Sequence, residues 1–280
     1  MNLFNKIFAY IKITRPLNVV ITFGVVAVSI LISQKHSTEV SLIILASLSA
    51  ALIAAAGNII NDISDVETDK ISHPKRVLPL GILTKTEAKI EYLILNFIAG
   101  IISLYLSYTL FVIVFISAIL LLVYSAYLKK IPLIGNITIA TLTGLAFIYG
   151  GFAVENAEAA IIPAVFAFLL NLIREIVKDV QDEEGDKKQN IITYPVKYGI
   201  DSAKKLATII TIILIAFTFY PFLAHIYKIE YFVIVMIIVN PVSVICIKNL
   251  LQKRDTNIAL ISNLLKLNMI IGLIAIYFGH

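Results

Sequence analysis

The chain has 280 residues, 59% of them hydrophobic and only 15% charged, with a mean hydropathy of +0.93. This composition excludes an ordinary soluble domain. The single cysteine, Cys246, excludes an intrachain disulfide, and the four scattered histidines have no metal-binding spacing. The net charge of +5 is not gathered in a basic domain outside the apolar runs, so we expect no nucleic-acid partner.

In chain order, apolar runs long enough to span a bilayer recur nine times. They cover residues 17–33, 40–60, 88–109, 111–128, 134–153, 158–178, 205–226, 230–250 and 260–278. We do not interpret the first run as a removable signal peptide, because no small-residue cleavage site follows it. Gly144, Gly150 and Gly151 in the fifth run are expected to allow close helix packing. The sequence predicts an all-α, polytopic membrane protein with nine transmembrane helices.

The basic residues predict the orientation of these helices. If the N-terminus is cytoplasmic, 21 of the 23 Lys and Arg residues, all but Lys35 and Lys228, fall in segments on that side. This bias follows the positive-inside rule. Residues 1–16 have one apolar helical face, so we expect them to lie on the inner membrane surface before Pro16. We therefore expect a multi-pass protein of the cell membrane whose N-terminus is cytoplasmic.

Two acidic segments with matching spacing follow the second and sixth runs. At offsets of 0, 4, 7 and 11, the first segment has Asn58, Asp62, Asp65 and Asp69, and the second has Glu175, Asp179, Asp182 and Asp186. On a continuing helix each set shares one face. Carboxylates are costly in lipid and repel one another, whereas Mg²⁺ binds carboxylate, amide and phosphate oxygens together. A solvated helix end would explain one or two acids but not two matching sets.

The two acidic segments are four spans apart, so both open on the same, cytoplasmic side. We predict a single domain over residues 1–280, built from two four-helix halves in a parallel repeat plus a ninth helix. Such a repeat would bring both acidic segments to one cytoplasmic mouth above an apolar cavity. A cation transporter is the competing class. Transporters place polar groups near the membrane midplane, whereas the charges here lie at one end of the spans.

These motifs resemble the UbiA superfamily of intramembrane prenyltransferases over essentially the whole chain. The superfamily pattern N-D-x-x-D-x-x-x-D is matched at 61–69, and D-x-x-x-D at 182–186. The tail R-P-x-P-x-G is partly kept at 76–81, with Val77 in place of the first proline. The resemblance implies a nine-helix bundle that transfers an isoprenyl group from its diphosphate to an acceptor with Mg²⁺ as cofactor.

The resemblance and the chemistry of an allylic diphosphate together assign the site residues. The expected metal ligands are Asn61, Asp62, Asp65, Asp69, Asp182 and Asp186. The expected diphosphate-binding residues are Lys75, Arg76, Tyr124, Lys129 and Arg174. Asp69, Glu175 and Lys178 are the expected catalytic residues, and Glu175 would steer the carbocation or take the acceptor's proton.

Within the superfamily, residues 65–76 and 174–186 most resemble the archaeal digeranylgeranylglyceryl phosphate synthases. Ser72 and Thr68 stand where that group has Asn and Ile. The resemblance implies transfer of a geranylgeranyl group from geranylgeranyl diphosphate to geranylgeranylglyceryl phosphate in archaeal ether-lipid synthesis. An aromatic acceptor of a quinone pathway, such as 4-hydroxybenzoate, also carries an anion, so charge leaves that alternative open. The sequence gives neither the oligomeric state nor the prenyl chain length.

Overall fold

The computed structural model describes residues 3–188, 191–252 and 257–280, and these ranges contain helices but no strand. Within them, nine helical segments are long and apolar enough to cross a membrane. These are Pro16–Ser33, Val40–Ser64, Lys85–Leu106, Tyr108–Ala126, Ile134–Ala153, Ala157–Lys188, Ile200–Leu223, Ile229–Leu250 and Ile258–Gly279. The prediction of an all-α protein with nine spans is confirmed. Lys253 and Arg254, which contribute to the predicted orientation, lie outside the described residues, as do residues 1 and 2 of the predicted surface segment.

The chain forms two compact units, and the first contains residues 1–128 and 146–158. Its elements are α1 (Leu3–Ile13), α2 (Pro16–Ser33), α3 (Val40–Ser64), α4 (Val66–Ser72), α5 (Lys85–Leu106), α6 (Tyr108–Ala126) and the second part of α7 (Ile134–Ala153). Helix α3 lies at the centre of this unit, packed against α2, α5 and α6. One core cluster includes Ile30, Ile53, Leu110 and Tyr149, so it joins four of these helices.

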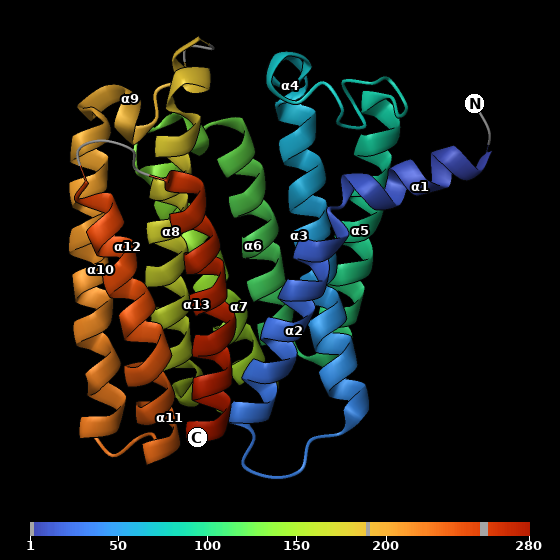
Figure 1. Ribbon diagram of the computed structural model, residues 1–280. Helices are drawn as coiled ribbons and strands as arrows, with labels where there is room; N and C mark the ends of the chain where they lie inside the picture. Colours follow the sequence, from blue (N-terminus) through green and yellow to red (C-terminus); the bar gives the residue numbers. More distant parts are fainter. Residues whose placement is uncertain (1–2, 189–190, 253–256) are drawn as a thin grey trace. The chain divides into compact units, whose positions relative to one another are not determined.

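Helix α1 runs across the direction of α3 and α5 rather than along it (Figure 1). Ala9 and Ile13 are buried against the unit, whereas Ile7, Phe8 and Ile11 are more than half exposed. The protein therefore leaves an apolar face of this helix uncovered. This arrangement suits a helix that lies in the membrane interface.

The second unit contains residues 129–145 and 159–280. A 3₁₀ turn (Leu128–Lys130) leads into the first part of α7, and another (Ala157–Ala160) into α8 (Ile161–Lys188). There follow α9 (Tyr194–Tyr198), α10 (Ile200–Leu223), α11 (Ile229–Ile234), a π-helical turn (Val235–Val239), α12 (Asn240–Leu250) and α13 (Ile258–Gly279). Helix α8 is central here and packs against α9, α10 and α13. The predicted pairing of two four-helix halves stays a prediction.

The start of α5 shows how local sequence sets a helix boundary. Thr84 Oγ1 accepts a hydrogen bond from the Glu87 amide at 3.1 Å, and Glu87 Oε2 accepts one from the Thr84 amide at 2.9 Å. This capping box satisfies amide groups that the first helical turn leaves free. The helix therefore begins at Lys85, three residues before the apolar run that predicted it.

Two glycines of α7 allow close approaches, each inside one unit. A Cβ atom at Gly144 would lie 2.9 Å from the carbonyl oxygen of Ala164 on α8. A Cβ atom at Gly150 would lie 2.6 Å from the Cβ of Ser29 on α2. Neither distance is possible for a real side chain without a helix shift, so the predicted role of these glycines in packing is confirmed.

Candidate active site

The first acidic segment begins at the end of α3 and continues into α4. The helix turns at Asp65, whose φ of −98° and ψ of 5° separate the two elements. Hydrogen bonds nevertheless continue across the turn, from the Asp65 amide to the Asn61 carbonyl at 3.0 Å and from the Asp69 amide to the Asp65 carbonyl at 2.7 Å. The expected continuous helix is therefore interrupted by one turn residue, while the four-residue spacing of its polar groups is kept.

Arginine side chains neutralise two buried carboxylates of this segment. Asp62 is 5% exposed and accepts a hydrogen bond from Arg15. Asp69 is 2% exposed, and Nη1 of Arg76 lies 2.8 and 2.7 Å from its two carboxylate oxygens. The same Nη1 is 3.7 Å from Oδ1 of Asp62. Burial of these charges is tolerated because each has an opposite charge beside it.

Other polar residues of this segment lie at its surface. Lys75 is exposed, and Nζ of Lys70 lies 2.7 Å from Oε2 of Glu67. This hydrogen bond, with the charges of Lys70 and Lys85, holds the pKa of Glu67 below its ordinary value. Glu67 is thus an exposed, ionised carboxylate on the face of α4 away from Asp69.

The second acidic segment lies within one uninterrupted helix, α8. Asn136, at the start of α7, donates a hydrogen bond from Nδ2 to Oδ2 of Asp179 at 2.8 Å. Asp182 is exposed on the same helix. Thr193 donates from Oγ1 to Oδ2 of Asp186 at 3.1 Å. The predicted shared face is present. Two residues from outside α8 donate hydrogen bonds to it, Asn136 to Asp179 and Thr193 to Asp186.

Glu175 is 8% exposed and has two cationic neighbours on α8. Nη2 of Arg174 is 2.6 Å from its Oε1, and Nζ of Lys178 is 3.9 Å from its Oε2. Arg174 also donates from Nε to Oδ1 of Asn171 at 3.2 Å, which fixes the guanidinium. The expected catalytic pair Glu175 and Lys178 is therefore brought together, with Arg174 beside them.

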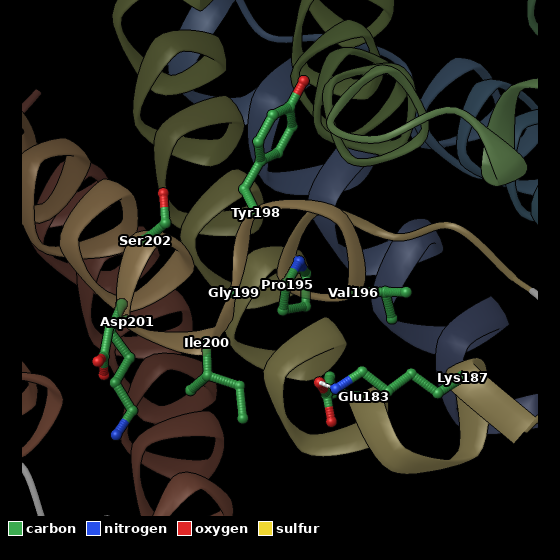
Figure 2. A pocket seen from close by; sticks show the side chains of 10 residues that line it. Glu183, Lys187, Pro195, Val196, Tyr198, Gly199, Ile200, Asp201 and Ser202 are labelled. Atoms are coloured by element: carbon green, nitrogen blue, oxygen red, sulfur yellow. Dashed lines mark ion pairs between the residues drawn. The ribbon is translucent and has the colours of Figure 1, made fainter.

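A cavity of about 690 Å³ lies beside the end of α8 (Figure 2). Its lining includes Glu183, Lys187, Tyr198 and Ser202. Figure 2 shows Glu183 and Lys187 joined by an ion pair near the connection between α9 and α10. None of the predicted metal ligands lines this cavity, although Glu183 lies between Asp182 and Asp186 along α8.

The remaining expected residues lie near the connection from α6 to α7. Tyr124, in the last turn of α6, is half-buried, and so is Lys129, in the 3₁₀ turn that follows. Sequence analysis did not assign Arg15, Asn136 or Thr193 to the site. Their contacts with the acidic segments bridge 47, 43 and 7 residues of chain. Neither the hydropathy nor the motif spacing singles out any of the three.

The oxygen donors of both segments suit a hard divalent cation. Within the described residues, no group of three or more His, Cys, Asp or Glu side chains is already gathered as a metal site. The donors are carboxylate and amide oxygens, which Mg²⁺ binds, and it commonly takes its other ligands from water and substrate phosphates. An ionised carboxylate has about four acceptor positions, so Asp69 can bind Arg76 and still offer oxygen to a cation. The residues therefore fit Mg²⁺.

A nine-span helical fold with two acidic segments of this chemistry defines an intramembrane prenyltransferase, and the chain belongs to the UbiA prenyltransferase family, which matches residues 20–270. It is similar to the digeranylgeranylglyceryl phosphate synthase of Methanosphaera stadtmanae, with 36% identity over 81% of this chain and 83% of that protein. The enzyme of the same name from Saccharolobus solfataricus is 33% identical over 97% of this chain and 96% of that protein.

Solved structures agree with this family. A structure described for digeranylgeranylglyceryl phosphate synthase has a TM-score of 0.84 and 31% identity, and the match covers 98% of each chain. A UbiA homolog from Archaeoglobus fulgidus, bound to GPP and Mg²⁺, has a TM-score of 0.72 and 19% identity over 96% of this chain and 99% of that one. The second likeness shows the shared fold.

Proposed function

We propose that this protein transfers the geranylgeranyl group of geranylgeranyl diphosphate to the free glycerol hydroxyl of geranylgeranylglyceryl phosphate. The observation that carries the acceptor assignment is the similarity to digeranylgeranylglyceryl phosphate synthases along nearly the whole chain. The product is digeranylgeranylglyceryl phosphate, an intermediate of archaeal ether-lipid synthesis. In the reaction, the bond from the prenyl carbon to the diphosphate oxygen breaks, and a bond from that carbon to the glycerol oxygen forms.

The proposal assigns the oxygen donors of both acidic segments to a magnesium diphosphate. The residues that would hold it are Asn61, Asp65, Asp69, Asp182 and Asp186. Bound Mg²⁺ supplies Lewis acidity that stabilises the negative charge on the departing diphosphate. Arg76, Lys75, Lys129 and Lys178 supply positive charge for phosphate oxygens.

Proton removal is assigned to the second acidic segment. Glu175 is paired with Arg174 and Lys178, and in the proposed reaction it accepts the proton that the glycerol hydroxyl loses as the ether bond forms. The surrounding apolar side chains of α8, such as Ile176 and Val177, are buried. They keep water away from the reactive prenyl group.

The basic bias of the connecting segments supports a cytoplasmic N-terminus and a cytoplasmic opening of the site. That side of the membrane is where soluble isoprenyl diphosphates would reach the protein. The acceptor's phosphate needs cations and its tail needs an apolar wall, and both are abundant at the ends of these spans.

The deciding assay offers purified protein geranylgeranyl diphosphate and Mg²⁺ with one acceptor at a time. We expect ether product from geranylgeranylglyceryl phosphate and none from 4-hydroxybenzoate. Asp65→Asn and Asp182→Asn should each lower the rate about 100-fold or more, because each removes a carboxylate that would bind the Mg²⁺ on which departure of the diphosphate depends. Glu184→Gln, at an exposed position of α8, is the matched control and should keep the wild-type rate. Product from 4-hydroxybenzoate alone would refute the acceptor, and wild-type rates in both aspartate variants would refute the site.

A further inference from the structure

Arg15 occupies an unusual position between α1 and α2. Its φ of 54° places it in the left-handed region, which non-glycine residues rarely adopt. The proposed function gives Arg15 no role. A backbone conformation of this kind persists where surrounding contacts fix it, and such positions cluster at functional sites.

Three groups of contacts fix the backbone around Arg15. Nδ2 of Asn58 on α3 donates a hydrogen bond to the carbonyl of Thr14 at 2.8 Å. Ile13 is 1% exposed and belongs to a core cluster that also contains Ile59 of α3 and Val66 of α4. The guanidinium of Arg15 then donates to Oδ1 of Asp62. Asn58, Ile59 and Asp62 all belong to the last two turns of α3.

The contact with Asp62 continues into a row of alternating charges. Arg15 contacts Asp62, Asp62 lies 3.7 Å from Arg76, and Arg76 contacts both oxygens of Asp69. Asp62 and Asp69 are both buried, with side chains 7% and 3% exposed. If a neutral residue replaced Arg15, Asp62 would be a buried anion whose nearest remaining cation is Arg76. Arg76 would then be drawn away from Asp69, because an unpaired buried charge is more costly than a shared one.

We propose that Arg15 is a positioning residue for the first acidic segment and that Asp62 is its counter-ion rather than a ligand of the metal. This inference rests on the proposed function for its metal and diphosphate. Because Arg15 neutralises Asp62, Arg76 stays paired with Asp69. Arg76 in turn holds the Asp69 carboxylate in one orientation. The surface helix α1 therefore contributes to the site through Arg15, the second residue after its end.

Four variants test this role: Arg15→Gln, Arg15→Lys, Asp62→Asn and the double variant Arg15→Gln with Asp62→Asn. The measurements are the Mg²⁺ concentration at half-maximal rate, kcat and KM, and the thermal stabilisation of the protein by Mg²⁺ with geranylgeranyl diphosphate in the absence of acceptor. We expect Arg15→Gln to raise the half-maximal Mg²⁺ concentration by about 10- to 100-fold. Loss of a residue that orients a metal ligand without touching the metal typically weakens metal binding by that factor. Arg15→Lys, which keeps the charge, should recover most of that loss.

The double variant separates a counter-ion from a ligand. If Asp62 only balances Arg15, neutralising both leaves no unpaired charge, so the double variant should need no more Mg²⁺ than Arg15→Gln alone. It also serves as the measurable variant if Arg15→Gln does not fold. The matched control is Lys12→Gln, a neutralised cation at an exposed position of α1, which should behave as wild type.

Two results would overturn the inference. If the double variant multiplies the losses of the two single variants in rate and Mg²⁺ requirement, and Asp62→Asn is the more damaging single change, Asp62 is a direct ligand of the metal. An Arg15→Gln protein that unfolds at a lower temperature but keeps the wild-type kcat, KM and Mg²⁺ dependence would make Arg15 merely structural. If the wild type makes no product from any acceptor, the proposed function fails, while the thermal stabilisation by Mg²⁺ and diphosphate still decides the role of Arg15.

Discussion

Replacement of Gly150 by alanine tests the close contact between α7 and α2. The new Cβ would lie 2.6 Å from Cβ and 2.7 Å from Oγ of Ser29, and 3.1 Å from the carbonyl oxygen of Val26. A Cβ atom cannot rotate away, so the helices must separate, at a cost of about 1–3 kcal/mol. The shift also strains the hydrogen bond of 2.6 Å from Ser29 Oγ to the Phe147 carbonyl, whose loss costs about 1 kcal/mol.

Against these costs, alanine gains about 0.5–1 kcal/mol over glycine in a helix. We therefore expect Gly150→Ala to lower the free energy of unfolding by about 1–3.5 kcal/mol, the sum of these terms. The chain has no tryptophan, but its single cysteine, Cys246, is fully buried. A thiol-reactive fluorescent dye that labels Cys246 only on unfolding therefore reports stability in detergent.

Gly24→Ala is the matched control, because nothing lies within 4 Å of a Cβ built at this position of α2. It should be neutral or stabilising. Adding Ser29→Gly to Gly150→Ala removes the clashing Cβ, so the double variant should recover part of the loss. Equal stability of the Gly150→Ala and Gly24→Ala proteins would refute the packing described here.

Three further changes probe the site and its orientation. Asn136→Ala leaves Asp179 without its amide donor and should lower the free energy of unfolding by about 1–3 kcal/mol. Asn136→Asp should cost more, because it places a second carboxylate beside Asp179. Equal stability of both variants and the wild type in the dye assay would contradict this. Chelation of divalent cations should abolish transfer and added Mg²⁺ should restore it, whereas an unchanged rate in excess chelator would exclude a metal requirement. In a background with Cys246→Ser, cysteines introduced near Lys187 and near Asn156 should be labelled from the cytoplasmic and outer sides respectively, and labelling of both from one side would refute the predicted topology.

The sequence alone was sufficient to predict the helices and the shared helical face of the second acidic segment. Transmembrane spans can be predicted from local composition, because every backbone polar group in lipid must be satisfied within its own helix. The three- and four-residue spacing of the aspartates likewise fixes a shared helical face without knowledge of any neighbour. Boundaries were less exact: the turn at Asp65 and the start of α5 at Lys85 depend on backbone torsions and capping that hydropathy does not detect.

The partners of the buried carboxylates were decided only by the tertiary structure. Asp62 is paired with a residue 47 positions earlier, and Asp179 with one 43 positions earlier. No periodicity relates such positions, since the pairings arise when whole helices pack. The sequence determined that these acids had to be satisfied, because an unpaired charge in an apolar protein is too costly. The packing of α1 and α3 selected Arg15 for Asp62, and the packing of α7 and α8 selected Asn136 for Asp179.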